Sequence, residues 1–400
     1  MEFSVVGISG FYHNLEPSGG KLRAFPEDFV VEEVIDSIEK KDKGPVLVLK
    51  VKAKNWEHNR LVKFLARIYH VSPDRVYFSG TKDRRSVKIQ YFSIPGKIYK
   101  EVHLDDFEIL EYFYLDKPLS LGSHLYNRFT IVVRDCDAHR LKLNCLHLKE
   151  TGIVPNFYGP QRFGPLRPVT HLVGREIVKR NYREAVRLFV GYPGDDRFSS
   201  VRADFYETMD LNKALEEFPE SLDLEIKVLR FLKENDGNYV GALKQLPKNL
   251  VSMFVHAYQG YIFNKMVSER IKLSRGIEVG DIYRTEGELV RVSNLNIDKI
   301  RNAFNRGIGS PTGTVIGYDS ELSSGMMGEI EKKIMQEEGI TPTDFKLPFG
   351  LKSAGERRDI YTRVSDLECS DEKISFTLPP GSYATSVMRE MMRVEEMSNY

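Results

Sequence analysis

Cysteine is scarce in this chain of 400 residues, and no apolar run reaches the length of a membrane span. The three cysteines, Cys136, Cys145 and Cys369, form no CxxC pair and no even framework. That usage predicts a reducing compartment and argues against a zinc site. The N-terminal stretch carries neither a basic leader nor a clean apolar core, so we expect no secretory signal. These absences favour a cytoplasmic protein that does not enter a membrane.

The signatures of the common enzyme classes are also missing. The stretch GIGSPTG (residues 307–313) lacks both the GxGxxG order after a strand and the Lys-Ser/Thr ending of a P-loop, so we expect a cluster of turns there. The nine histidines are scattered, and none pairs at metal-ligand spacing with a carboxylate or thiol. No GxSxG elbow occurs. If the protein is an enzyme, these absences favour chemistry that is independent of metals and nucleotides.

Charges of the two signs nearly cancel, but their distribution is uneven. The net charge is +1, and an apolar fraction of 41% with a charged fraction of 29% is typical of a soluble globular protein. Residues 51–100 carry twelve Lys/Arg against three Asp/Glu, an excess of +9, so the other 350 residues sum to −8. Such a segment is either a solvated face or a surface for a polyanion.

The hydrophobic pattern changes along the chain. Strand-like alternation is found in residues 29–34, 45–55, 75–80, 86–94 and 126–135, and residues 55–72 have the spacing of an amphipathic helix with Asn55 as a candidate N-cap. From Arg180 to about Leu273 the pattern is largely helical, and strand-like alternation returns near the C-terminus. We therefore expect an α+β or mixed α/β protein in which a large domain is inserted into a core built from both ends of the chain.

Two kinds of motif carry candidate chemistry. In GTKDRRSVKIQ (residues 80–90), Asp83 stands between Lys82 and the pair Arg84-Arg85. A charged β-turn is one interpretation; the other is that the cations favour an ionised carboxylate, which is a nucleophile or a base. The stretches NFYGPQRFGPLRP and YNRFTIVVR interleave Phe and Tyr with Arg, which suits unpaired nucleotides, although a loop and an ordinary strand are equally plain interpretations.

Taken together, five stretches resemble the TruD family of tRNA pseudouridine synthases, of the archaeal and eukaryotic type. They are FPEDFVVEE, FSGTKDRRSVKIQ, YNRFTIVVR, VPNFYGPQRFG and LPPGSYATSVMRE, which stand in the family's order between residues 25 and 390. The resemblance implies an α+β catalytic domain with a central mixed, mainly antiparallel sheet, formed by residues 1–152 and 361–400. A large α/β inserted TRUD domain would occupy residues 153–360.

The resemblance also implies site residues. The family's nucleophilic aspartate in G-x-K-D-x-x-x-V-x-x-Q falls on Asp83, with Gly80, Lys82, Val87 and Gln90 matching the motif.

The family's N-x-F motif falls on Asn127 and Phe129, where Phe129 would stack on the target uracil. Arg23 would be the ion-pair partner of Asp83. Bacterial-type relatives often have Lys at Arg23, Gly at Tyr126 and Thr at Lys88, and the Tyr126 departure bears on the backbone around Asn127.

The implied activity is the isomerisation of uridine to pseudouridine in tRNA, at position 13 in the family's usual targets. Asp83 would attack uracil C6 or ribose C1′, or remove a proton from ribose C2′, and no cofactor or metal is needed. We expect a cytoplasmic monomer with tRNA as its partner. Expected contacts to the RNA come from six polar side chains: Lys82, Arg84, Arg85, Lys88, Gln161 and Arg162. The alternatives are a non-catalytic RNA-binding protein of the same fold and an aspartate-dependent nucleoside hydrolase.

Overall fold

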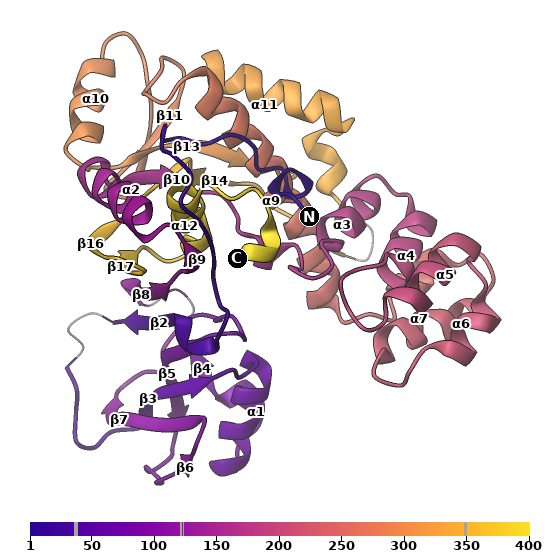
Figure 1. Cartoon of the computed structure of the whole chain (residues 1–400). Coiled ribbons are helices and arrows are strands. Elements are labelled where there is room, and N and C mark those ends of the chain that lie inside the picture. The colour runs from indigo at the N-terminus through magenta and orange to yellow at the C-terminus, as the bar shows by residue number, and fades with distance from the viewer. Residues whose placement is uncertain (36–38, 121, 123, 348–349) are drawn as a thin grey trace. The chain divides into compact units, whose positions relative to one another are not determined.

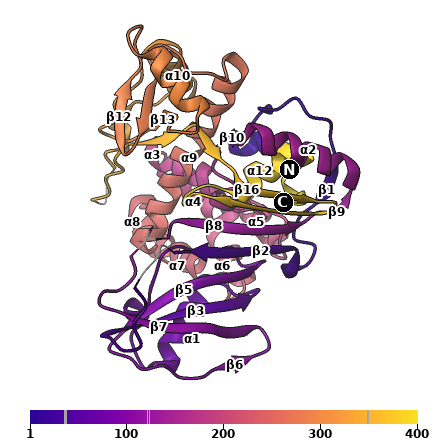
Figure 2. The same ribbon diagram turned by 90° about the vertical axis from the view of Figure 1, so that its left-hand side faces the viewer.

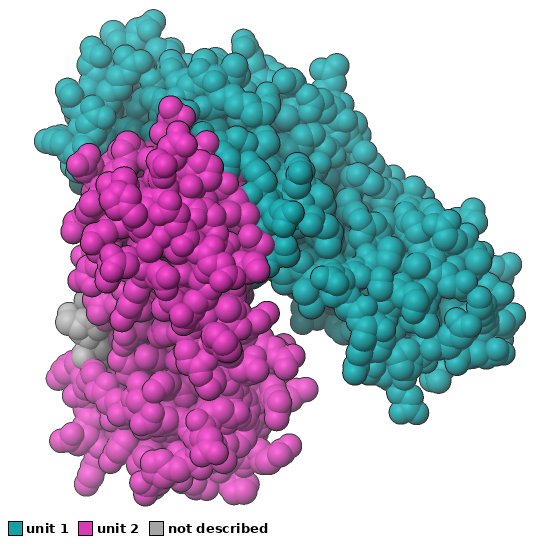
Figure 3. Space-filling view, in the orientation of Figure 1, with its two compact units in different colours: residues 1–12, 155–361, 395–398 teal, residues 13–154, 362–394, 399–400 magenta. Residues whose placement is uncertain are grey.

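The computed structural model describes residues 1–35, 39–120, 122, 124–347 and 350–400, and its chain divides into two compact units. The sheet unit comprises residues 13–154, 362–394 and 399–400, and the helical unit comprises residues 1–12, 155–361 and 395–398 (Figure 3). The sheet unit is therefore built from segments that lie on both sides of the long middle segment. Strands β10 (Ile153–Pro155) and β15 (Tyr361–Arg363) stand where the chain passes from one unit to the other.

A sheet of nine strands forms the sheet unit (Figures 1 and 2). Its order is β16-β17-β8-β2-β5-β3-β7-β6, with β4 beside β5. The β2–β5 pair is parallel and the other pairs of this sheet are antiparallel. The expected α+β class with a mixed, mainly antiparallel sheet is confirmed. The nine strands are β2 (Phe29–Val34), β3 (Val46–Lys54), β4 (Tyr77–Phe78), β5 (Val87–Pro95), β6 (His103–Leu104), β7 (Phe107–Leu115), β8 (Tyr126–Val132), β16 (Ser365–Ser370) and β17 (Lys373–Leu378).

Helix α1 (His58–Ile68) covers one face of β3, β5 and β7. Alternation along β3 sends Leu47 and Leu49 into the core beneath this helix and Val48 into a smaller cluster on the other face. The helix begins later than expected, because the side chain of Glu57, not Asn55, accepts the first free backbone N–H groups at 2.9 and 2.8 Å.

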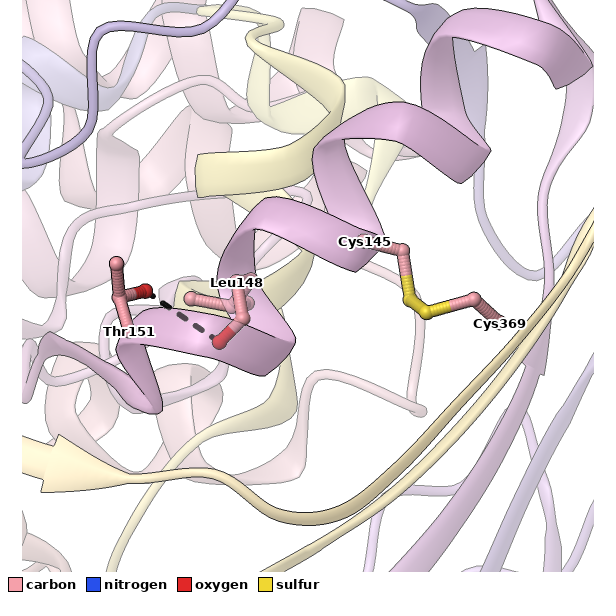
Figure 4. The surroundings of a disulfide bond; sticks show 4 residues. All are labelled: Cys145, Leu148, Thr151 and Cys369. Carbon is pink, nitrogen blue, oxygen red and sulfur yellow. Dashed lines mark hydrogen bonds between the residues drawn. A yellow bond between two sulfur atoms is a disulfide. The ribbon is translucent and has the colours of Figure 1, made fainter.

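The β16 end of the sheet is packed by α2 (Ala138–Thr151), which in turn packs against α12 (Ala384–Met392). A disulfide joins Cys145 on α2 to Cys369 on β16, with the two Cα atoms 5.9 Å apart (Figure 4). The expectation that the cysteines form no framework was therefore wrong for this pair, and Cys136 is the free thiol. Their separation of 224 residues hid the pairing, since only the fold brings the two positions together. Elsewhere in this unit, β1 (Gly19–Lys21) pairs with β9 (Arg134–Cys136).

The helical unit combines a helical cluster with a small sheet. Its helices are α3 (Thr170–Val178), α4 (Tyr182–Gly191), α5 (Ser199–Thr208), α6 (Leu211–Glu217), α7 (Asp223–Glu234), α8 (Tyr239–Leu243), α9 (Lys248–Leu273), α10 (Ile297–Asn305) and α11 (Gly325–Glu338). Among the helices that the structure describes, none is both long and apolar enough to cross a lipid bilayer.

The small sheet of the helical unit corrects one expectation from the sequence. Its order is β12-β11-β13-β14, and the strands are β11 (Ile282–Thr285), β12 (Glu288–Arg291), β13 (Ser310–Val315) and β14 (Glu356–Asp359). Strand β13 occupies most of the stretch that was expected to be a cluster of turns, and all six of its residues are buried. The turn lies just before the strand, where Gly307 and Gly309 have left-handed backbones with φ of 86° and 78°, and a Cβ added to Gly309 would meet the Arg284 carbonyl oxygen.

Candidate active site

The carboxylate of Asp83 lies in the loop between β4 and β5, where it pairs with the guanidinium of Arg23. Arg23 Nη2 donates to Asp83 Oδ2 at 2.6 Å, although the two residues are 60 positions apart in sequence. The hydroxyl of Ser86 donates to the backbone carbonyl of Asp83 at 2.8 Å and holds the turn. Because the Asp83 side chain is still 39% exposed, its carboxylate is oriented by a cation while remaining open to a ligand.

Arg23 is buried, and three groups hold its orientation. Its guanidinium lies over the ring of Phe29 at 4.0 Å from the centroid, and Nη1 donates to the backbone carbonyl of Tyr400 at 2.9 Å. The third group is Asp83. Burial lowers the pKa of Arg23, and the charge of Asp83 opposes that shift. A desolvated guanidinium with a carboxylate partner forms a strong, directional hydrogen bond, which suits it to orient Asp83.

The turn after Arg23 is anchored by the buried side chain of Asp28. This turn is a short 3₁₀ helix, Pro26–Asp28. Asp28 accepts a hydrogen bond from the backbone N–H of Phe25 at 3.0 Å and forms an ion pair with Arg134 Nη2 at 2.6 Å. The FPEDF motif therefore fixes the segment that presents Arg23.

Lys82 points into the protein, so we replace its expected substrate contact with an anchoring role. Its Nζ donates to Glu33 Oε1 at 2.6 Å, and Glu33 Oε2 accepts the backbone N–H of Tyr91 at 3.0 Å. The Lys82 and Glu33 side chains are 8% and 0% exposed. This ion pair ties the residue before Asp83 to strand β2.

Glu33 is a site residue that the sequence interpretation missed. A signal for it existed: Phe29 and Val31 occupy the inward register of β2, and Glu33 is the acid at the next inward position. A carboxylate in an apolar register needs a buried partner. The lysine of the neighbouring GTKDRR motif meets that need.

Lys88 is fully buried, which contradicts the expected contact between this residue and RNA. Its Nζ donates to the backbone carbonyls of Trp56 at 2.6 Å and Lys82 at 3.3 Å. The reason is strand alternation, because Lys88 shares a face of β5 with Phe92, which packs beneath α1. Lys88 therefore ties the Asp83 loop to the start of α1 from inside the protein.

Two further polar side chains are buried in the region of Lys82 and Lys88. Gln90 is fully buried, and its amide atoms have no hydrogen-bond partner among the residues that the structure describes. The ring nitrogens of His58 on α1 are likewise unpartnered within the described part of the chain. Burial, reinforced by the charge of Lys88, lowers the pKa of His58 to about 4, so its ring is neutral at pH 7.

Asn127 and Phe129 stand on β8, on the same face as Glu33. The register pairs Glu33 with Asn127 and Val31 with Phe129, and paired residues share a face. Phe129 is 7% exposed, with its ring 6.0 Å from that of Phe29 and 5.5 Å from that of Phe376.

Only one of the two polar atoms in the Asn127 amide has a hydrogen-bond partner among the described residues. Its Nδ2 lies 3.2 Å from Nε2 of His124, while the buried Oδ1 has no partner within the described residues. Burial and then the charge of Lys82 lower the pKa of His124.

The remaining predicted contacts fall in two places. Arg84 and Arg85 are exposed on the Asp83 loop, and Arg85 Nη2 donates to the backbone carbonyl of Ala24 at 3.1 Å. Gln161 and Arg162 belong to the helical unit, in the 3₁₀ helix Pro160–Arg162. The sheet unit thus contains Arg23, Lys82, Asp83, Asn127 and Phe129 without any contribution from those two residues.

The chemistry available to this site is that of one oriented carboxylate. In the part of the chain that the structure describes, no group of three His, Cys, Asp or Glu side chains is arranged to hold a metal ion. An ionised aspartate beside a buried arginine is suited to nucleophilic attack or to removal of a proton.

Comparison with known proteins identifies the family. The model of the family described as tRNA pseudouridine synthase D (TruD) matches residues 5–391. This chain belongs to the TruD family.

The relatives of this TruD member match nearly its whole length. It is 36% identical to a "Probable tRNA pseudouridine synthase D" of Methanococcoides burtonii, covering 98% of this chain and 97% of the relative. It is 35% identical to a protein of the same name from Thermoplasma volcanium, covering 94% and 95%. The crystal structure of the "Putative tRNA pseudouridine synthase D (TruD)" from Methanosarcina mazei superposes with a TM-score of 0.81 at 31% identity, covering 99% and 98%. Membership makes the protein an isomerase of the pseudouridine synthase class.

Proposed function

We propose that this protein isomerises uridine to pseudouridine in tRNA, with Asp83 as the catalytic nucleophile or base. The observation that supports the role of Asp83 most directly is its 2.6 Å ion pair with buried Arg23. A turn of charged residues without a catalytic role has no need of a desolvated cation brought from 60 positions away. The curated relatives of this chain are named for the same class of reaction.

The reaction rearranges one base without net oxidation or hydrolysis. The bond between uracil N1 and ribose C1′ breaks, the base turns, and C5 bonds to C1′ while the C5 proton is lost and N1 gains one. We propose that the Asp83 carboxylate starts this sequence by adding to uracil C6 or ribose C1′, or by removing the C2′ proton. The hydrogen bond from Arg23 orients the carboxylate.

The target base is proposed to lie against the face of β8. Uracil carries an N3–H donor, and the buried Oδ1 of Asn127 is an acceptor without a partner among the described residues. Phe129 offers a ring for stacking, although part of that ring already contacts Phe29 and Phe376. Extruding a uridine from its stack costs a few kcal/mol, which these contacts offset.

The wider assignments follow from the family. We propose that residues 1–152 and 361–400, which include most of the sheet unit, form the catalytic domain and that residues 153–360 form the inserted TRUD domain. Phosphate or base contacts are proposed for Arg84, Arg85, Gln161 and Arg162. We further propose that the protein acts as a cytoplasmic monomer without a cofactor, on uridine 13 of its tRNA targets.

The test of the catalytic assignment is Asp83→Asn. We expect this variant to form no detectable pseudouridine, because an amide neither attacks uridine nor accepts the proton, while tRNA binding and the fold persist. Tritium release from tRNA labelled at uridine C5, together with mass spectrometry of the nucleosides, measures the outcome.

The matched control is Asp74→Asn, which changes an exposed aspartate nine positions upstream and is expected to retain activity. Pseudouridine formation by Asp83→Asn would contradict the role of Asp83. Release of free uracil by the parent protein would favour a hydrolase, and binding of tRNA without any product would favour a non-catalytic RNA-binding protein.

A further inference from the structure

The excess of positive charge in residues 51–100 is not spread evenly over the sheet unit. The two lysines of this segment that lie on β3 are paired with carboxylates, Lys52 with Glu108 at 3.9 Å and Lys54 with Glu27. The unbalanced charge therefore lies elsewhere in the segment.

Much of it lies on helix α1. The helix contains Arg60, Lys63 and Arg67 and no acidic residue. The three side chains are exposed, and none of them forms an ion pair with a carboxylate among the described residues. Arg60 lies over the ring of Trp56 at 5.2 Å, a contact that leaves its positive charge uncancelled.

The spacing of these cations puts them on one face. Positions i, i+3 and i+7 follow each other along a helix, so the stripe from Arg60 to Arg67 is about 10 Å long. The opposite face carries Leu61 and Leu65, which are fully buried against the sheet. The exposed face, which Asn59 completes, is thus basic or amide at every position.

Helix α1 also begins at the Asp83 loop. The backbone N–H of Asn55 donates to the carbonyl of Ser86 at 2.9 Å, and Lys88 Nζ donates to the carbonyl of Trp56 at 2.6 Å. These bonds join the residues just before the helix to the residues just after Asp83. A polyanion that extends from the loop along α1 would meet successive uncompensated charges.

We propose that this exposed face of α1 (Asn59, Arg60, Lys63 and Arg67) binds the phosphate backbone of the tRNA substrate outside the target uridine. The inference rests on the proposed tRNA-modifying function. Unpaired cations at helical spacing suit a chain of phosphates, which needs charge at intervals and no fixed base sequence. A merely solvated face is expected to carry mixed signs, as β3 and its neighbours do.

The test removes the three charges together in Arg60→Gln/Lys63→Gln/Arg67→Gln. Glutamine keeps helix propensity and loses the charge. We expect KM for an unmodified tRNA transcript to rise on the order of 10- to 100-fold at 0.15 M salt, with kcat retained, because Asp83 and Arg23 are untouched. The slope of log KM against log salt should become shallower by about 2 to 3.

A control variant removes the same number of charges from paired lysines of the same unit: Lys41→Gln/Lys52→Gln/Lys54→Gln. These lysines pair with Asp116, Glu108 and Glu27. We expect KM to stay within about threefold of the parent value, because paired cations release few counterions. For the same reason the slope of log KM against log salt should stay within about one unit of the parent slope. Circular dichroism and thermal melting confirm that both variants are folded.

The outcomes separate the two proposals. A parent protein that forms no pseudouridine in tRNA would defeat the proposed function. An active parent with an α1 variant of unchanged KM and salt slope would overturn the α1 inference alone. The exposed face of α1 would then be solvated or bind an acidic protein, and it would not bind tRNA. Equal losses in both variants would also overturn it, because net charge and not the α1 face would then be responsible.

Discussion

At the scale of single residues, the site depends on charged groups that have different surroundings in the same motif. Lys82 and Lys88 are six positions apart, and both are turned inward to hold the loop. Arg84 and Arg85 between them are exposed. Asp83 stands at the boundary, with its carboxylate paired to Arg23 and still accessible. Sequence adjacency alone does not distinguish an anchor from a surface charge, since both are positively charged.

Lys88 carries a testable consequence of burial. Burial lowers the pKa of Lys88 to about 8, against the opposing charge of Asp83. The unfolded chain therefore binds more protons than the folded one between pH 8 and the ordinary lysine value of about 10.4, so stability rises with pH across that window. The gain from this group is about 3 kcal/mol in full. We expect Lys88→Met to lose this rise.

The measurement is the free energy of unfolding from urea titrations between pH 7.5 and 10.5. The comparison uses the slope with pH, because Lys88→Met also leaves the Trp56 and Lys82 carbonyls without their donor. Lys63→Met, at an exposed position on α1, is the control and should keep the parent slope. Identical slopes for the parent and Lys88→Met would show that the ammonium is not desolvated as described.

At the scale of elements, the sheet unit is closed by contacts between segments that are distant in sequence. Strand β8 pairs with β2 on one side and with β17, about 250 positions later, on the other. The disulfide between Cys145 and Cys369 fastens α2 to β16 at the same end of the unit. Asn144, beside Cys145, donates from Nδ2 to the backbone carbonyl of Met391 at 2.7 Å, so the same helix is also held by a hydrogen bond.

Loss of the disulfide should lower stability without stopping the reaction. Cross-linking positions 224 residues apart restricts the unfolded chain, and such a bond contributes about 2–5 kcal/mol. We expect Cys145→Ser to lower the melting temperature by roughly 5 to 15 °C while activity at 25 °C is kept. Differential scanning calorimetry measures the shift.

Cys136→Ser, which replaces the free cysteine, is the matched control and should melt close to the parent. Alkylation of the denatured, unreduced protein provides an independent check. One labelled cysteine is expected, and three labelled cysteines would show that the bond does not form in solution.

At the scale of the whole molecule, the chain forms two compact units, and each has a core of its own. Phe376 on β17 is fully buried in the sheet unit and lies against Phe129. Phe205 on α5 is 1% exposed in the helical unit and lies 6.4 Å from the ring of Phe218. Two separate cores predict two regions whose stabilities are changed independently by core substitutions.

Each of the two phenylalanines serves as the control for the other. Phe376→Ala and Phe205→Ala should each cost about 3–5 kcal/mol. By hydrogen exchange resolved by peptide, we expect Phe376→Ala to lower protection in β2, β5 and β8 and to spare α4–α7. Phe205→Ala should do the reverse. Equal loss of protection in both units from either substitution would mean that the chain unfolds as one cooperative body.

Much of the architecture was predictable from local patterns. Alternation marked β2, β3, β5 and β8, the 3.6-residue period marked α1, and the change of pattern after about residue 150 marked the passage to a largely helical segment. The exceptions have physical causes. The stretch GIGSPTG contains turn-forming residues, yet β13 forms there because partner strands on both sides supply its backbone hydrogen bonds. Propensity is a weak guide where tertiary pairing satisfies the backbone.

The amino-acid sequence by itself determined the family, the motif around Asp83 and the candidate partner Arg23, because these depend on residue types and their order. Only the tertiary structure decided which charged side chains are buried or paired and which are exposed and free to contact a ligand. It buried Lys82 and Lys88, supplied Glu33 as an ion-pair partner, joined Cys145 to Cys369, and left Arg60, Lys63 and Arg67 unpaired on α1. Burial and pairing depend on what the rest of the chain places nearby, and the free energy of a charge depends on those neighbours far more than on its position in a motif.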